Sequence, residues 1–192
     1  MVEALAGVLS AFGLSSAAGL NAYLPLLIVA LTARYTDLIQ LQAPWDALTN
    51  PWVIGVLAVL LVIEVVADKV PAVDHVNDVI QTVVRPAAGA ILFASAGSVI
   101  SDIHPALALI CGILVAGTVH GAKATFRPVV TATTGGVGNP VVSTVEDVVS
   151  GTLTVMAILA PILGFILLVL IAWLIWRWWR GRRMRTPTSV AR

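Results

Sequence analysis

Five long runs without a charged side chain constrain this sequence more than any other feature. They cover residues 4–33, 47–63, 86–101, 103–122 and 148–176. A helix needs about 20 apolar residues to cross the hydrocarbon core of a bilayer, and the first and last runs are longer than that. Only 11% of the residues are charged, whereas soluble domains carry about 25%. We therefore expect an all-α, polytopic membrane helix bundle with five to six membrane segments.

Several of these segments are expected to be broken or extended. The runs at 47–63 and 86–101 are short, so their helices must continue into polar neighbours or lie beside other protein, because lipid satisfies no backbone groups. Pro25 interrupts the first run and Pro161 the last, and proline kinks or breaks a helix. We expect one transmembrane domain at 1–176, followed by a basic tail at 177–192.

The C-terminal sequence WLIWRWWRGRRMR predicts the orientation of the chain in the membrane. It places four tryptophans beside a dense cluster of arginines, which is typical of an interfacial aromatic belt followed by a cytoplasmic flank. We expect the C-terminus to be cytoplasmic, with Trp45 and Trp52 at the opposite interface. Attraction to anionic lipid headgroups accounts for the arginines, so the expected partner is the lipid bilayer and not nucleic acid.

The stretch at 72–84 is amphipathic with a helical period. Val76, Ile80 and Val83 share one face, while Asp78 and Gln81 lie on another together with Asp74 and Arg85. The polar face is acidic, unlike the basic polar face of most interfacial helices. We expect a helix packed on the bundle with its polar side toward a cavity; the alternative is a helix lying flat on the membrane.

A second polar stretch, at 120–149, surrounds the sequence TTGGVGNP. The glycines do not match a phosphate-binding loop, which needs a Gly-Lys-Ser/Thr ending after a strand. Glycine tolerates positive φ and close backbone approach. We interpret the stretch as a polar re-entrant element whose glycine run is a hinge or turn between two half-helices.

Residues 17–33 and 119–136 resemble each other. Gly19, Asn21, Ala22 and Pro25 match Gly121, Lys123, Ala124 and Pro128, with the proline one residue out of register. The copies begin in the first and fourth runs, so they would run in opposite directions. The similarity fits an inverted repeat, a common transporter architecture, and it also fits chance in a sequence rich in Gly and Ala.

Eight ionisable side chains at the ends of the apolar runs are the candidate site. For binding a solute these are Lys123, Arg127, Arg85 and His120, and for proton or ion coupling Glu64, Asp68, Glu146 and Asp147. Such groups cost about 2.5–3.5 kcal/mol each in a membrane interior, which calls for pairing or function. Three readings stay open: ion pairs that only stabilise the fold, loops in water at the membrane surface, and a site for a solute or ion.

Other kinds of site find no support in the sequence. His75, His104 and His120 lack metal-ligand spacing, and the single Cys111 lies in an apolar run. No serine occupies a Gly-x-Ser-x-Gly elbow. We therefore expect no metal, no cofactor and no enzymatic activity. A membrane enzyme acting on lipid head groups stays open as a third class, but it would need a nucleophile or a metal cluster.

Four sequence motifs resemble those of a known family. The motifs GLNAYLPLL, EVVADKVPAVDHVNDV, RPAAGA and HGAKATFRPVVTATTGGVGNPVVSTVEDVVS are together similar to a bacterial family of small integral membrane proteins, domain of unknown function 4126. The resemblance covers residues 5–160 and leaves the Trp/Arg tail as a variable end. Relatives often have an arginine where this chain has Asn21, which weakens the case for a symmetric basic site. The resemblance implies a bacterial inner-membrane location and no particular activity.

Two functions follow as hypotheses. The first is a transporter or channel for a small polar or anionic solute, held by the cations while the acids exchange protons. The second is a non-transporting membrane scaffold or lipid-interacting subunit whose charges only pair within the fold. A chain of this size can also enclose a pathway as a homo-oligomer, although no residue pattern identifies an interface.

Overall fold

The computed structural model describes residues 2–69, 71–96 and 104–183, and this part of the chain is helical with no strand. The helices are α1 (Val2–Leu20), α2 (Tyr23–Tyr35), α3 (Pro51–Ala67), α4 (Pro71–Ala96), α5 (Pro105–Thr134), α6 (Asn139–Leu159) and α7 (Pro161–Arg183), with a short 3₁₀ helix, η1, at Trp45–Thr49. Among these residues, four segments are long and apolar enough to cross a membrane: Asn77–Ala96, Pro105–Thr134, Asn139–Leu159 and Pro161–Trp178. The all-α polytopic bundle expected from the sequence is confirmed.

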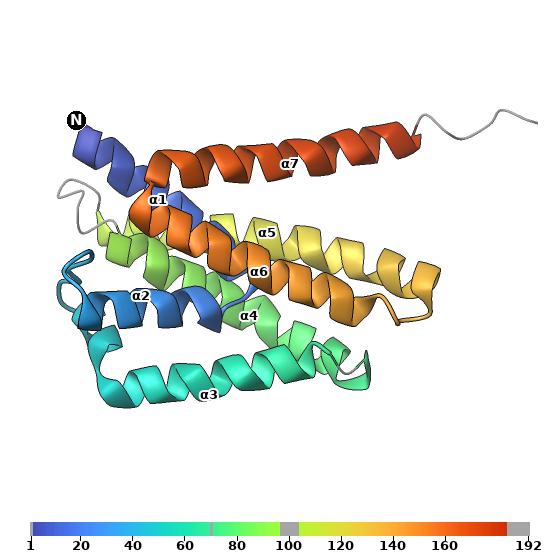
Figure 1. Ribbon diagram of the computed structural model, residues 1–192, viewed down its shortest axis with the longest axis horizontal. Coiled ribbons are helices and arrows are strands. Elements are labelled where there is room, and N and C mark those ends of the chain that lie inside the picture. The colour runs from blue at the N-terminus through green and yellow to red at the C-terminus, as the bar shows by residue number, and fades with distance from the viewer. Residues whose placement is uncertain (1, 70, 97–103, 184–192) are drawn as a thin grey trace, which may run out of the picture.

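The first apolar run forms a hairpin of two short helices. α1 and α2 run in opposite directions, and the turn between them lies inside the bundle (Figure 1). Asn21 makes the turn: its Oδ1 accepts hydrogen bonds from the backbone N–H groups of Tyr23 at 3.1 Å and Leu24 at 2.9 Å. An asparagine in this position caps a helix N-terminus. The arms contain 19 and 13 residues, so the pair enters and leaves at one end of the bundle.

The remaining long helices, α3 to α7, follow one another in alternating directions along the bundle (Figure 1). Both short runs continue into polar neighbours as expected: the helix of the run 86–101, α4, already begins at Pro71, and the helix of the run 47–63, α3, continues past Glu64 to Ala67. The last run, 148–176, is not one kinked span. It divides at Ala160 into α6 and α7, since the residue before a proline is disfavoured in helix, and the chain reverses direction there.

The stretch at 120–149 differs from the re-entrant element expected from its sequence. Residues 120–134 are the second half of α5 and residues 139–149 the first half of α6. The glycine run is the turn between these helices, with Gly135 and Gly136 at φ +62° and +88°. α5 continues through Pro128, so the element that turns back inside the bundle is the α1–α2 hairpin.

The repeat expectation is only partly reflected in the structure. Residues 17–33 contain the break between α1 and α2, while residues 119–136 lie in α5 and the turn that ends it. α2 does run opposite to α5 (Figure 1). The break at Asn21 has no counterpart at Lys123, because α5 is continuous there.

Small residues bring the central helices close together. α1, α4 and α5 pack on one another, and α1 also packs on α6. A Cβ atom at Gly112 of α5 would overlap the backbone of Gly89 and Ala90 in α4, and one at Gly19 of α1 would lie 2.6 Å from the carbonyl oxygen of Ala116. Small residues allow such approach between membrane helices. The outer faces are apolar, including Val59 and Val62 of α3 and Ile166 of α7.

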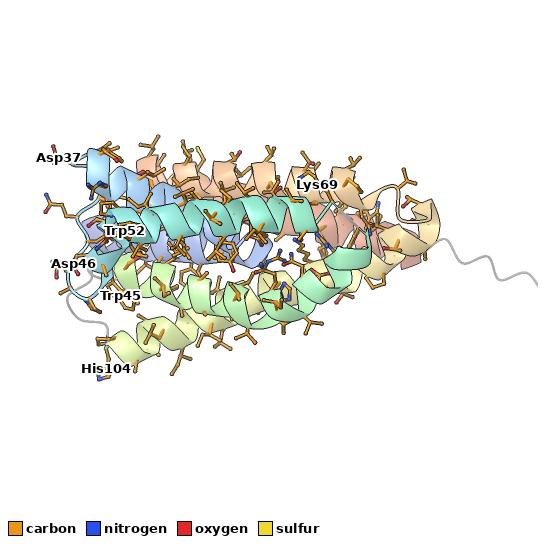
Figure 2. The ribbon with its side chains drawn as sticks, turned by 90° about the horizontal axis from the view of Figure 1, so that it is seen from below. Asp37, Trp45, Asp46, Trp52, Lys69 and His104 are labelled. Atoms are coloured by element: carbon orange, nitrogen blue, oxygen red, sulfur yellow. The ribbon has the colours of Figure 1, made fainter. Side chains whose placement is uncertain are left out.

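The two ends of the bundle carry different side chains. Trp45, Trp52, Asp37, Asp46 and His104 lie together at one end (Figure 2), the end at which α1 begins. α7 ends at the opposite end, where its last turns carry Arg177 and Arg180. The predicted basic tail is described as far as Arg183, and 184–192 lie outside the described residues.

Candidate functional site

The polar face of α4 is the first component of the site. Asn77, Gln81 and Arg85 are buried along one face of the helix, and Val79 and Val83 are exposed on the other. The amphipathic pattern is therefore oriented with its polar side inward, against α3 and α5. The side chains of residues 71–76, including Asp74 and His75, lie outside the described part. The polar face of α4 contacts charged side chains of other helices. It does not line the cavity that the structure describes, contrary to what we expected from the sequence.

Asp68, which follows α3, is the centre of an ion-pair network. Its Oδ2 lies 3.5 Å from the Lys123 ammonium, 3.2 Å from the Arg127 guanidinium and 3.8 Å from that of Arg85. Asn77 donates to its other oxygen at 2.7 Å. Lys123 and Arg127 project from α5 four residues apart, which puts them on one helix face. One carboxylate thus contacts three cations that come from two helices.

Glu64 and Arg85 form the most buried ion pair. The Arg85 guanidinium donates to Glu64 Oε1 at 3.0 Å, and both side chains are fully buried. The other guanidinium nitrogen, Nη1, lies 3.1 Å from Nδ1 of His120, and Nε2 of His120 lies 3.2 Å from Thr82 Oγ1. Since Arg85 can only donate, Nδ1 accepts and the ring proton is on Nε2. His120 is therefore a neutral acceptor that orients Arg85.

The two acids of α6 complete the network. Glu146 lies 2.8 Å from Lys123 and 3.4 Å from Arg127. Asp147 accepts a hydrogen bond from the Asn21 amide at 2.9 Å and lies 3.9 Å from the more exposed Lys69. Seven of the eight ionisable residues singled out in the sequence are thus joined by direct side-chain contacts, and Asp147 lies beside them, bonded to Asn21 and paired with Lys69. These eight residues, with Lys69 and with Asp78, which lies 3.5 Å from Arg127, are called the ion-pair network below.

The hairpin turn contacts this network directly. Lys123 donates to the carbonyl oxygen of Leu20, the last residue of α1, at 3.1 Å. The backbone N–H of Ala22 faces Glu64 Oε1 at 3.4 Å, and Asn21 bonds Asp147. At the helix break, the carbonyl of Leu20 therefore faces the Lys123 ammonium, and the backbone N–H of Ala22 faces the Glu64 carboxylate. Backbone groups exposed by such a break require polar partners inside a membrane.

Sequence reasoning missed at least five members of the site. Asn21, Asn77, Asp78, Gln81 and Ser143 were absent from the candidate set: Asp78 lies 3.5 Å from Arg127, and the Ser143 hydroxyl donates to Asp68 at 3.5 Å. Asp78 and Gln81 share the polar face of the amphipathic stretch, which was the available signal. Asn21 could have been found as the lone amide in an uncharged run, four residues before Pro25. The pairing of Ser143 has no signal in the sequence.

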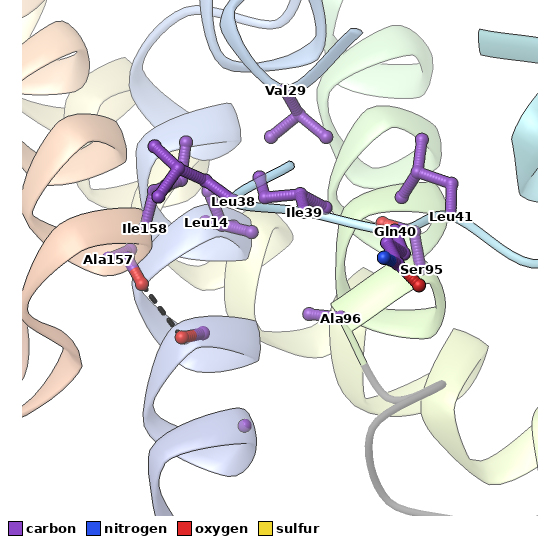
Figure 3. Close-up of a pocket in the computed structure, with 12 residues that line it drawn as sticks. Leu14, Val29, Leu38, Ile39, Gln40, Leu41, Ser95, Ala96, Ala157 and Ile158 are labelled. Carbon is purple, nitrogen blue, oxygen red and sulfur yellow. Dashed lines mark hydrogen bonds between the residues drawn. The ribbon is translucent and has the colours of Figure 1, made fainter. Parts of the chain in front are cut away.

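A separate cavity of about 160 Å³ lies between the arms of the hairpin (Figure 3). Leu14 and Val29 line it from the two arms, Ala157 and Ile158 from α6, and the segment 38–41 covers it. The Ser10 hydroxyl donates a hydrogen bond to the Ala157 carbonyl oxygen at 2.7 Å. None of the network residues lines this cavity. In the described part of the chain, no three His, Cys, Asp or Glu side chains are grouped to hold a metal ion.

Comparison with protein families places the chain. A family model described as Domain of unknown function (DUF4126) matches residues 8–181, from α1 into α7. The chain belongs to this family. The DUF4126 match includes the hairpin turn and every member of the ion-pair network. No curated protein and no solved structure matches the chain.

In this DUF4126 member, Asn21→Ala is expected to lower the free energy of unfolding by about 1–2 kcal/mol, because the turn loses its cap and Asp147 loses a buried donor. Asn21→Asp keeps the cap but faces the Asp147 carboxylate, so it should be no more stable than Asn21→Ala. Equilibrium unfolding in detergent micelles measures both. Asn50→Ala, which removes the exposed cap of α3, is the control, and a larger loss there would contradict the role of Asn21.

Proposed function

We propose that the protein is a small membrane transporter, and that the ion-pair network at the hairpin turn is where a small polar or ionic solute crosses. One observation carries this proposal: the chain breaks a helix inside the bundle and places the broken backbone against paired charges. Broken helices whose ends meet ions or substrates near the bilayer midplane are characteristic of secondary transporters. A hairpin that only fills space would not need an asparagine turn bonded to Asp147.

The same proposal places the chain in the bacterial inner membrane with its C-terminus in the cytoplasm. Arg177 and Arg180 lie toward the end of α7, whereas Asp37 and Asp46 lie at the opposite end. Cytoplasmic flanks are enriched in lysine and arginine. The beginning of α1 would then face the periplasm.

The pairing of the cations bears on the choice of solute. Lys69, Arg85, Lys123 and Arg127 each lie within 4.0 Å of a carboxylate. An anion would have to displace one of these carboxylates in order to bind. The geometry therefore favours a polar or cationic solute over the anion suggested by the basic residues of α5.

The second candidate function is a non-transporting scaffold. It is favoured by the direct contact between the charged groups, which leaves no gap for a solute between them. Lys123 to Glu146 at 2.8 Å and Arg85 to Glu64 at 3.0 Å are short, complete contacts. Buried pairs can serve structure alone. In this reading the hairpin turn is held in place and never moves.

Flux through purified protein in liposomes tests the two functions. The expected result is uptake of one or more small cations or neutral polar solutes, from a panel that also includes anions, by liposomes with the protein and not by empty ones. Asp147→Asn should reduce that flux while leaving the protein monodisperse, because it weakens the contact of α6 with the turn. Absence of flux for the whole panel with folded protein would contradict transport and support the scaffold.

A further inference from the structure

In the part of the chain that the structure describes, the ion-pair network contains more acids than cations. Its described carboxylates are Glu64, Asp68, Asp78, Glu146 and Asp147, and its cations are Lys69, Arg85, Lys123 and Arg127. Among these described side chains, the acids exceed the cations by one. A net charge in a low-dielectric interior is costly, so one additional positive charge would stabilise the network.

The buried atoms without a partner are mainly acceptors. Among the described residues, Glu64 Oε2, Asp78 Oδ1 and Gln81 Oε1 are buried and have no hydrogen-bond partner, and one donor, Arg85 Nε, is in the same position. Glu64 and Gln81 are each 1% exposed. A buried acceptor without a donor costs about 1–3 kcal/mol. What the network lacks is therefore a hydrogen-bond donor that carries positive charge.

Glu64 has less cationic support than Asp68, the other fully buried acid, and than the partly buried Glu146. Asp68 contacts three cations and Glu146 contacts two, whereas the one cation within 4.0 Å of Glu64, in the described part, is Arg85. Arg85 is itself shared, because it lies 3.8 Å from Asp68 and 3.1 Å from His120. If Glu64 became neutral, Arg85 would keep these two partners.

We infer that Glu64 is a proton-binding site whose occupancy controls the α1–α2 hairpin turn. A proton delivered by hydronium, which leaves as water, adds to the unpartnered Oε2, and the carboxylate becomes a neutral acid. Neutral Glu64 is a weaker acceptor at Oε1, which faces both the Arg85 guanidinium and the N–H of Ala22. Protonation thus loosens the turn from α3. This inference rests on the proposed function, for which it names the coupling ion.

A proton fits this site better than a metal cation. Among the described residues, the charged and titratable groups facing Glu64 are Asp68 from the end of its own helix, Arg85 from α4, Tyr23 from α2, and Lys123 and, through Arg85, His120 from α5. Two of these groups, Arg85 and Lys123, are basic side chains whose positive charge repels a metal cation. A proton occupies no extra volume, and the cavity of about 160 Å³ is lined by other residues.

Infrared difference spectroscopy of the full chain in liposomes tests the proton site. On acidification, the wild type is expected to gain the C=O band of a protonated carboxylic acid, and Glu64→Gln is expected to lose that band. Glu146→Gln is the matched control, since it removes a network carboxylate with two cation partners and should keep the band. A band that persists unchanged in Glu64→Gln would overturn the inference.

Thiol labelling tests the coupling to the hairpin. In a Cys111→Ala background, Ala22→Cys reports exposure of the turn to a water-soluble maleimide. Labelling should increase on acidification, and should be fast at every pH when Glu64→Gln is added, since glutamine mimics the protonated acid. Glu64→Asp retains a titratable group on a shorter side chain; it should keep the infrared band and also label quickly. Labelling that is independent of pH in the otherwise unchanged chain would overturn the coupling.

The two proposals fail separately. Protonation of Glu64 with no flux of any solute would overturn transport and leave the proton site standing. Flux with no infrared band from Glu64 would overturn the proton site and leave transport standing.

Discussion

Replacing Lys123 with methionine is expected to lower the free energy of unfolding by about 3–5 kcal/mol, the usual cost of removing one partner from a buried ion pair. Methionine fills a similar volume, so the loss reports charge and hydrogen bonding. The ammonium contacts Glu146 at 2.8 Å, Asp68 at 3.5 Å and the Leu20 carbonyl at 3.1 Å. Reversible unfolding in mixed detergent micelles is the measurement.

Two further variants show whether the loss comes from unpaired charge. Lys123→Met combined with Glu146→Gln should recover at least half of the loss, because the acid left with fewer partners is also neutralised. Lys69→Met removes an ammonium that is 38% exposed and 3.9 Å from Asp147, so it should cost less than about 1 kcal/mol. Equal losses for Lys69→Met and Lys123→Met would contradict a buried network. If the variant with both Lys123→Met and Glu146→Gln is stable but no longer transports solute, the result would favour a transport site over a scaffold.

Adding one methyl group at Gly112 is expected to destabilise the protein by about 3 kcal/mol, the upper end for overpacking. The new Cβ would overlap Gly89 and lie 2.6 Å from the Cα of Ala90. Both obstacles are backbone, so α4 and α5 would have to separate. Thermal unfolding of Gly112→Ala in detergent measures the effect.

Gly121→Ala is the matched control on the same helix. No atom lies within 4 Å of the position of its Cβ, so the change should stay within about 0.5 kcal/mol of the wild type. If both glycines tolerate alanine, the close packing of α4 on α5 would be wrong.

The charged residues were predictable from the sequence because a membrane interior penalises them strongly. Glu64, Asp68, Lys123, Arg127 and Glu146 each lie at the end of an apolar run, and the structure brings them together. Their partners could not be assigned in advance. Pairing depends on which helices are neighbours, and the spacing of charges along one helix does not contain that information.

The hairpin was hard to predict because its break carries no charge. The run at 4–33 is long enough for one span, and Asn21 is a single amide within it. At 120–149 a polar composition suggested two half-helices of a re-entrant element, whereas the structure has the long helices α5 and α6 joined by a turn at the glycine run. Polar residues there face protein partners, so the helix can stay intact while its charges are satisfied.

The attachment of α3 has a mechanical consequence. Near Trp52 the helix packs on α2 and η1. At its other end, ion pairs of Glu64 and Asp68 hold it to α4 and α5. Val62, Ile63 and Val66, close to these acids in the sequence, are exposed on the outer face. One end of α3 is thus held by apolar packing and the other by ion pairs. Loss of the ion pairs would free the Glu64 end of α3 to move sideways in the lipid, while the Trp52 end stays packed on α2 and η1. A change at the site would then alter the area that the protein occupies in the plane of the membrane.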